Sequence, residues 1–180
     1  MKLIIFGHQR HGKDTVCEYL EAEYGLTFSA SSMFACRLFL YEQIKDRFGY
    51  ASLEECFEDR VNHRQLWYEA IRDYNATDRA RLGKAIFAEH DVYCGIRDRE
   101  EFECLKREGQ FDLAIWIDAS QRKPLESTAS MTLTRDDADL VINNNGTLID
   151  LMEPVDGLMD RLGIARLAQR PPKETAHALP

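Results

Sequence analysis

The chain has 180 residues, with 31 acidic and 23 basic side chains and a formal net charge of -8. This length suits one α/β domain and is short for two. The negative charge repels polyanions at long range, so any anion must be held by a local site. The five cysteines are spread out, with no CxxC pair and no Cys/His cluster at metal-ligand spacing, which favours buried reduced thiols over a structural zinc site.

Hydropathy gives no sign of a membrane protein. The apolar run at 3–6 is shorter than a signal-peptide core or a membrane span, and no later run approaches about twenty apolar residues. We therefore expect a soluble cytoplasmic protein without a membrane partner.

Strand and helix signals alternate along most of the chain. In chain order we predict a strand at 2–6, a helix at 12–24, a strand at 26–29, helices at 31–49, 52–58, 64–74 and 77–89, a strand at 92–96, a helix at 99–108, strands at 113–117 and 139–142, and a helix at 147–162. Ser31 or Ser32 and Ser52 are the expected N-caps, and Gly25 is an expected C-cap. Pro154 falls inside the last helix, which it should kink or split.

This alternation predicts an α/β fold. Strands joined through helices run parallel, so we expect a five-stranded parallel sheet with helices on both faces. In such sheets, ligands bind at the carboxyl ends of the strands. We expect a single domain over 1–165, with a polar loop or mobile flap at 119–135 and a loosely ordered tail at 166–180.

A Gly-x4-Gly-Lys pattern follows the first predicted strand and opens the first predicted helix, which is the context of a phosphate-binding Walker A loop. The glycines let backbone N–H groups turn inward, the helix N-terminus adds about half a positive charge, and Lys13 can bridge the β- and γ-phosphates. The residues expected to bind ATP in this loop are Gly7, His8, Gln9, Arg10, His11, Gly12 and Lys13.

The loop departs from the usual motif at Asp14, where a serine or threonine normally ligates Mg²⁺. A carboxylate is a competent hard ligand but also repels phosphate, so we expect ATP binding to depend strongly on Mg²⁺. Thr15 offers an alternative hydroxyl one residue later. Both residues are candidates for contacts with ATP and the metal.

The run at 7–15 resembles the phosphate loop of the bacteriophage deoxynucleoside monophosphate kinases, which carry an arginine before a small-Gly-Lys-Asp-Thr run. Phosphomevalonate kinases of the same superfamily have a similar Gly-Lys-Asp. The resemblance covers roughly 1–31 and 93–162 and is weak in the helical middle. It implies a P-loop kinase of the host cytoplasm, with a helical acceptor-binding insertion at 31–90 and a lid at 119–135.

Two arginines match the part of this family that grips the acceptor. The run from Arg64 to Trp67 resembles the helix that begins with an arginine and faces the acceptor phosphate. Arg97 resembles the arginine of the strand-to-helix turn, where it would also assist transfer by neutralising phosphate oxygens. With Ser31, these three residues are the predicted substrate-binding set. Gly95 stands where the family often has an acidic residue, which predicts a remodelled acceptor site.

The resemblance also assigns residues to the ATP side. Arg122 follows the fourth predicted strand, where kinases of this superfamily carry lid arginines that fold over ATP, so it is a candidate for ATP binding and catalysis. The run at 139–148 resembles the strand, turn and closing helix near the adenine. Asn144 and Gly146 are the candidate contacts in that turn.

The role of Asp118 leaves the identity of the acceptor undecided. Asp118 ends the fourth predicted strand and can be a base, a magnesium ligand or a strand-end cap. If the acceptor is a deoxynucleoside monophosphate, no base is needed and positioning with charge neutralisation suffices. If the acceptor is an alcohol, such as the hydroxymethyl group of 5-hydroxymethyluracil in phage DNA, Asp118 is placed to act as the base. The motif matches and the net charge favour the monophosphate.

A basic groove could still attract DNA against the acidic balance of the chain. Its candidate residues are Arg60, Arg64, Arg72, Arg79 and Arg81. A third reading is a nucleotide-binding switch without transfer chemistry, although the Asn-Lys-x-Asp signature of guanine specificity is absent. The sequence leaves open whether the chain forms a homodimer.

Overall fold

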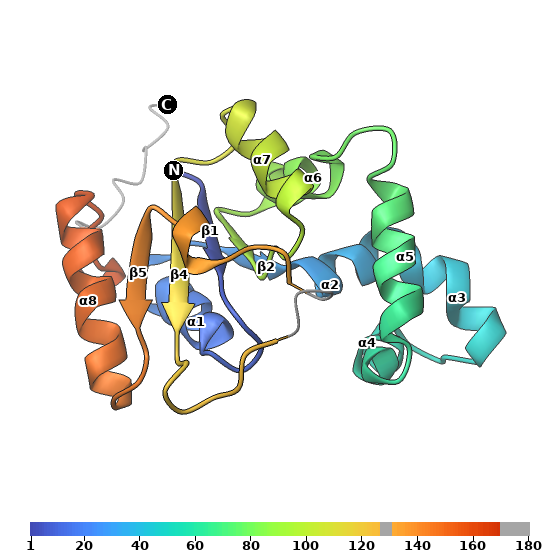
Figure 1. Ribbon diagram of the computed structural model, residues 1–180, viewed down its shortest axis with the longest axis horizontal. Coiled ribbons are helices and arrows are strands. Elements are labelled where there is room, and N and C mark those ends of the chain that lie inside the picture. The colour runs from blue at the N-terminus through green and yellow to red at the C-terminus, as the bar shows by residue number, and fades with distance from the viewer. Residues whose placement is uncertain (127–130, 170–180) are drawn as a thin grey trace, which may run out of the picture.

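Five parallel strands form one sheet in the order β2-β3-β1-β4-β5 (Figure 1). The strands are β1 (Leu3–Phe6), β2 (Phe28–Ala30), β3 (Val92–Cys94), β4 (Leu113–Asp118) and β5 (Leu140–Asn143). The computed structural model describes residues 1–126 and 131–169. β1 lies at the centre and pairs in parallel with β3 and β4. The predicted five-stranded parallel sheet is confirmed.

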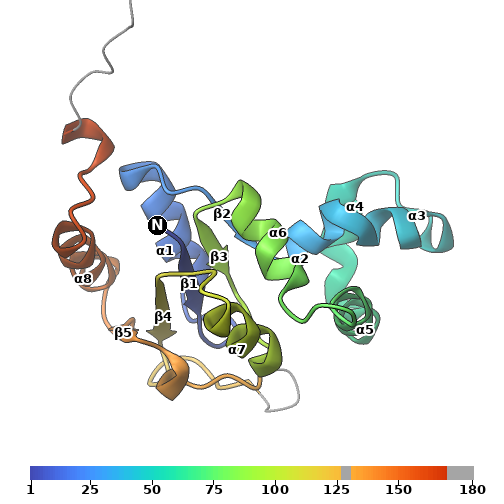
Figure 2. The same cartoon turned by 90° about the horizontal axis from the view of Figure 1, so that it is seen from above.

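Helices connect the strands and cover both faces of the sheet (Figure 2). They are α1 (Lys13–Tyr24), α2 (Ser31–Ala35), α3 (Tyr41–Phe48), α4 (Leu53–Glu58), α5 (Arg64–Tyr74), α6 (Arg81–Glu89), α7 (Arg99–Arg107) and α8 (Leu148–Arg161). Short 3₁₀ turns lie at Asp59–Val61, Arg135–Asp137 and Leu167–Gln169. Each helix in the described part of the chain is too short or too polar to cross a membrane.

The central strand is buried on both sides because its successive side chains face two different cores. Ile4 and Phe6 pack with α6 and α7, whereas Leu3 and Ile5 pack with α1 and α8. All four side chains are fully buried. This double burial explains the continuous apolar run at the start of the sequence.

The π-helical turn at Cys36–Leu40 and helices α3 to α5 form a unit with its own core, which we call the helical module. It lies beyond the edge strand β2, on the right in Figure 1. Its buried core residues are Cys36, Leu40, Ile44, Cys56 and Trp67. All five cysteines of the chain are buried with free thiols, as predicted.

Local hydrogen bonds shift several element boundaries from the predicted ones. A π-helical turn at Cys36–Leu40 separates α2 from α3, where one helix was expected. Ala30 occupies the N-cap position of α2, so the predicted serine cap is wrong and Ser31 is the first helical residue. The helix predicted at 77–89 begins only at Arg81. The Leu82 amide donates a 3.0 Å hydrogen bond to Asn75 Oδ1 and not to the carbonyl of an earlier helical residue.

Four predictions about caps, a strand end and a proline have clear outcomes. Gly25 ends α1 with φ 68°, and Ser52 caps α4 by accepting a 3.2 Å hydrogen bond from the Glu55 amide, both as predicted. β3 stops at Cys94, because Gly95 turns the chain with φ 83° before the predicted strand end. α8 continues through Pro154 without being split.

The last described residues are fastened to α1 and α8. Arg166 Nη2 donates to Asp156 Oδ2 at 2.5 Å, and Nη1 donates to Glu23 Oε2 at 2.8 Å. The hydroxyls of Tyr19 and Tyr24 both donate to Asp156 Oδ1 at 2.7 Å. The predicted tail at 166–180 thus begins with an anchored residue, and 170–180 lie outside the described residues.

Asp156→Asn should destabilise the fold by about 1 to 3 kcal/mol at pH 7, because the charged acceptor of this cluster is lost. Burial alone would raise the pKa of Asp156, but the bonds from Tyr19 and Tyr24 and the Arg166 charge hold it below its ordinary 3.8. The carboxylate therefore contributes stability above that value and loses it as pH falls through the lowered pKa.

Urea unfolding at pH 7 and at low pH measures both effects. The difference between the wild type and the variant should shrink in acid. Asp160→Asn is the matched control, since Asp160 is exposed on the same helix. Equal destabilisation by the two substitutions would contradict the anchoring role of Asp156.

Candidate phosphate-binding site

The backbone between β1 and α1 makes a tight loop that few side chains permit. Gly7, Arg10 and Gly12 have positive φ angles of 143°, 62° and 94°. A Cβ on Gly7 would lie 2.5 Å from the Ile117 carbonyl oxygen, and one on Gly12 would lie 2.3 Å from Asn144 Nδ2. The loop is therefore pressed against the end of β4 and the turn after β5, and glycine is required at both contacts.

Lys13 crosses the inside of this loop. Its side chain is 8% exposed, and Nζ donates a 2.7 Å hydrogen bond to the His8 carbonyl oxygen. Burial lowers the pKa of Lys13, and the Arg97 charge acts in the same direction, while the carboxylates of Asp14 and Glu126 oppose them. A buried ammonium at a helix N-terminus gives this position a strong attraction for anions.

Asp14 and Thr15 stand exposed in the first turn of α1. Asp14 Oδ1 accepts a 3.5 Å hydrogen bond from the Cys94 thiol. Mg²⁺ commonly binds through one or two carboxylates together with phosphate and water, so an exposed carboxylate next to Lys13 fits that role. Asp118 ends β4, where its Oδ1 accepts a 3.0 Å hydrogen bond from the Ser120 amide.

Asp14, Thr15 and Asp118 do not converge into a metal-binding cluster. Within 1–126 and 131–169, three metal-binding side chains converge only at Asp78, Cys104 and Glu108. There Lys84 Nζ already pairs with Asp78 at 2.8 Å and with Glu108 at 2.6 Å, so an ammonium fills that position. Any magnesium at Asp14 would complete its shell with water and phosphate oxygens.

The two histidines of the loop connect it to the segment after β4. His11 is fully buried, its Nδ1 accepts from the Ala119 amide at 3.1 Å, and Nε2 donates to the Pro124 carbonyl oxygen at 3.3 Å. His8 Nδ1 accepts from the Glu126 amide at 3.2 Å. Burial lowers the pKa of His8, which keeps its ring neutral and able to accept that bond.

Asn144 braces the loop from the other side. It is 4% exposed, and its Nδ2 donates a 2.8 Å hydrogen bond to the His11 carbonyl oxygen. Arg122 donates to the side-chain and main-chain oxygens of Asn144, both at 2.6 Å. The structure thus brings Asn144 and Arg122 to the loop, with Arg122 bound to the turn. Gly146 is exposed in the same turn, before α8.

On the opposite side of the loop, the turn after β3 brings in two predicted acceptor residues. Ser31 Oγ donates to the Gly95 carbonyl oxygen at 3.3 Å, and a Cβ on Gly95 would lie 3.8 Å from Lys13 Cε. Arg97 follows two residues later and pairs with Glu126. Ser31 and Arg97 therefore lie around the Gly95 turn beside Lys13, and their substrate-binding roles remain predictions.

Glu126 lies at the loop although it was not predicted as a site residue from the sequence. Its Oε2 accepts a 2.6 Å hydrogen bond from the Gln9 amide of the loop, and its side chain is 11% exposed. The available signal was that Glu126 is the only acidic residue in the stretch 119–135, which is otherwise rich in Ser, Thr, Lys and Arg. Composition alone could not show that this residue points at the phosphate loop.

The helical module contributes two neighbouring arginines. Arg64 is exposed at the start of α5, and the Arg60 guanidinium lies 3.7 Å from the centre of the Phe57 ring. Burial lowers the pKa of Arg60; the charge of Asp14 opposes this shift, and the charge of Arg64 adds to it. In the described part of the chain, neither arginine forms an ion pair.

Trp67 takes a different position from the predicted one. It is 5% exposed, and its ring lies 6.3 Å from that of Phe57 inside the core of the helical module. Its Nε1 has no hydrogen-bond partner among the described residues. The side chain supports the helix that carries Arg64 from within.

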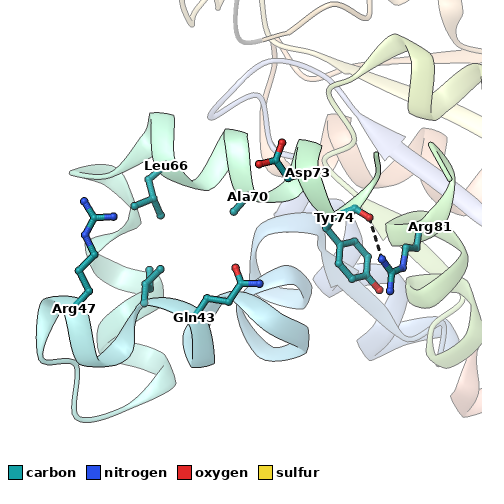
Figure 3. A pocket seen from close by; sticks show the side chains of 8 residues that line it. Gln43, Arg47, Leu66, Ala70, Asp73, Tyr74 and Arg81 are labelled. Atoms are coloured by element: carbon teal, nitrogen blue, oxygen red, sulfur yellow. Dashed lines mark hydrogen bonds between the residues drawn. The ribbon is translucent and has the colours of Figure 1, made fainter. Parts of the chain in front are cut away.

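A separate hollow of about 570 Å³ lies in the helical module between α3 and α5 (Figure 3). It is lined by Gln43, Ile44, Arg47, Leu66, Ala70, Asp73, Tyr74 and Arg81. This lining shares no residue with the phosphate loop or with the predicted acceptor-binding set, so the hollow is a separate feature. We assign the candidate site to the loop, because the predicted phosphate-binding residues lie there.

Comparison with known proteins supports the fold. No protein-family model matches the chain, and no curated protein matches it in sequence. Protein TT1252 from Thermus thermophilus has a TM-score of 0.50 at 18% identity, over 90% of this chain and 97% of that one. A shikimate kinase from Aquifex aeolicus has 0.46 at 14% identity, over 91% and 99% of the two chains. A gluconokinase from Sinorhizobium meliloti has 0.46 at 13% identity, over 89% and 92%.

At such identities the likeness concerns the fold alone. The α/β class and the parallel sheet predicted from the sequence are confirmed. The resemblance to the bacteriophage enzymes remains a prediction.

Asn144→Ala should destabilise the fold by about 1 to 3 kcal/mol, because the His11 carbonyl loses its donor and Arg122 keeps only its bond to the main-chain oxygen of residue 144. Binding of an ATP analogue should weaken as well, since the loop loses its brace. Thermal unfolding and calorimetric titration measure the two effects. Asn143→Ala is the control, because Asn143 is exposed at the end of β5 and its side chain accepts hydrogen bonds from Asn145 rather than from the loop. Unchanged nucleotide binding in Asn144→Ala would contradict the bracing role.

Proposed function

We propose that the chain is an ATP- and Mg²⁺-dependent phosphotransferase that transfers the γ-phosphoryl group to a nucleotide-like acceptor. The observation that carries this proposal is the loop between β1 and α1, where the buried Lys13 ammonium lies at a helix N-terminus. A loop of this form cradles phosphate oxygens with its backbone N–H groups. Phosphoryl transfer needs positioning and charge stabilisation more than covalent chemistry by the protein.

The residues of the site divide this work. The loop amides and Lys13 hold the β- and γ-phosphates, and Arg97 disperses the charge that develops on the transferring group. Mg²⁺, when bound through Asp14, supplies the positive charge that lets a carboxylate stand beside a triphosphate. Arg122 and Asn144 lie on the side where the adenosine would bind.

We propose a deoxynucleoside monophosphate as the acceptor. The supporting observation is the arrangement of Arg60 and Arg64, two neighbouring cations without an ion pair in the described residues, with Arg60 close enough to Asp14 for their charges to interact. Two adjacent like charges are stabilised by an anion between them, and a phosphate dianion accepts hydrogen bonds from both. An acceptor phosphate held there would face the phosphate loop.

An alcohol acceptor, the hydroxymethyl group of a pyrimidine in DNA, is the second candidate. The position of Asp118 at the carboxyl end of β4 favours it, since a base is useful there. The predicted basic groove is partly neutralised, however: Arg72 pairs with Asp73 at 3.4 Å, and Arg79 pairs with Glu100 at 3.1 Å. With a net charge of -8, this surface suits a small anion better than a polyanion.

ADP release in the presence of ATP, Mg²⁺ and each acceptor separates the candidates. We expect release with one or more deoxynucleoside monophosphates and little without an acceptor. Release only with hydroxymethylated DNA would favour the alcohol acceptor. ATP binding without release for any acceptor would favour a nucleotide-binding switch.

Lys13→Ala should abolish turnover while the fold survives, because the ammonium contacts the transferring phosphate and stabilises its developing charge. The check is ADP release at saturating ATP, together with the far-ultraviolet circular dichroism of the purified variant. Lys106→Ala provides the control, since Lys106 is exposed on α7. Near-normal turnover by Lys13→Ala would rule out the phosphate-loop assignment.

Substitutions at Arg64, Arg97 and Asp118 distinguish the two acceptors. For a monophosphate, Arg64→Ala and Arg97→Ala should chiefly raise the acceptor KM, at a cost of about 1.5 to 3 kcal/mol, or roughly one to two decades in kcat/KM. For an alcohol, Asp118→Asn should lower kcat by on the order of two to four decades with nearly intact acceptor binding. Steady-state kinetics with both acceptors measures whether each substitution changes the acceptor KM or kcat. Normal acceptor KM values in both arginine variants would contradict the monophosphate proposal.

A further inference from the structure

The mouth of the phosphate loop already holds an anionic side chain. Glu126 Oε2 accepts the hydrogen bond of the Gln9 amide at 2.6 Å, and the other carboxylate oxygen pairs with Arg97. The Lys13 charge also acts on this carboxylate. A loop amide, an arginine and the loop lysine are the same kinds of partner that the proposed function gives to a phosphate.

The main chain around Glu126 is fastened in this position. Its amide donates to His8 Nδ1 at 3.2 Å, and the Pro124 carbonyl accepts from His11 Nε2 at 3.3 Å. Earlier in the segment, Arg122 is bound to Asn144. Residues 119–126 therefore lie along the loop through several separate hydrogen bonds, and Glu126 is the point where this segment meets the anion-binding groups.

The charge of Glu126 is favoured by its surroundings. Burial would raise the pKa of its carboxyl group, but the bond and charge of Arg97, the Gln9 amide and the Lys13 charge outweigh this and hold the pKa below its ordinary value. The group is thus ionised at neutral pH. A carboxylate and a triphosphate competing for the same cation repel each other, because both carry negative charge.

We propose that Glu126 is an internal competitor for the phosphate site: its carboxylate occupies the Gln9 amide and Arg97 until ATP displaces it. This inference rests on the proposed function, since it requires the loop to bind a triphosphate. Displacement transfers both partners to phosphate oxygens and detaches residues 119–126 at the Glu126 end. Arg97 then exchanges its ion pair with Glu126 for phosphate oxygens only when ATP binds.

Such competition lowers the apparent affinity for ATP by the fraction of molecules in which the site is open. If about nine-tenths of the molecules are closed, the apparent affinity is about tenfold weaker than that of the open form. Removing the negative charge without changing the shape of the side chain should recover this factor. Glu126→Gln makes that change.

The experiment is a calorimetric titration of the full chain with a non-hydrolysable ATP analogue and Mg²⁺. We expect about tenfold tighter binding by Glu126→Gln than by the wild type. Glu100→Gln is the matched control, because Glu100 is a surface carboxylate paired with an arginine away from the loop, and its affinity should stay at the wild-type value. Equal or weaker binding by Glu126→Gln, with a wild type that binds the analogue, would overturn the competitor role and leave the proposed function intact. A wild type that does not bind the analogue would overturn both.

A second measurement does not depend on changing Glu126. Leu125 is 63% exposed, and the native cysteines are all buried, so Leu125→Cys can be labelled selectively with an environment-sensitive fluorophore. Titration with the analogue should shift the emission saturably, at the concentration where calorimetry reports binding. Binding without any change in emission would show that the segment stays in place, and would contradict displacement.

Discussion

The phosphate loop can turn from β1 into α1 only because Gly7 and Gly12 carry no side chain where the backbone meets its neighbours. A Cβ at either position would lie within 2.5 Å of a neighbouring oxygen or nitrogen, which real Cβ atoms do not tolerate. At Gly12 the neighbour is Asn144, whose amide also binds the His11 carbonyl oxygen. This contact joins the start of α1 to the turn after β5. Lys13, the first residue of α1, is set inside the loop as a consequence.

An acidic chain can hold a phosphate only by concentrating positive charge over a short range. The structure does this with groups from distant parts of the sequence. The N-terminus of α1 supplies Lys13, the turn after β3 supplies Arg97, and the helical module supplies Arg60 and Arg64. Carboxylates are interleaved with them: Glu126 pairs with Arg97, and Asp14 lies near Lys13. The site therefore combines anion attraction with a built-in negative charge that a ligand or a metal must offset.

The sheet and the glycine turn between β1 and α1 were predictable because their signals are local. A buried central strand needs an unbroken apolar run, and a loop that turns into a helix N-terminus needs glycines at fixed spacing and a lysine. Boundaries in the helical middle of the chain were not predictable, because the π-helical turn at Cys36–Leu40 and the late start of α6 depend on packing and on the Asn75 side chain. Trp67 illustrates the same limit, since helical spacing places it near Arg64 but does not tell which face of α5 is buried. Glu126 was invisible for a related reason: only the folded chain brings residue 126 beside residue 9.

Backbone amide spectra of the isotope-labelled protein, recorded during titration with Mg²⁺ and a non-hydrolysable ATP analogue, show whether the loop amides and Lys13 bind the phosphates of ATP. The largest shifts should fall on residues 8–14 and saturate with one site, and adenosine alone should not reproduce them. Unshifted signals for residues 8–14 at saturating analogue, or shifts confined to the hollow between α3 and α5, would contradict this binding.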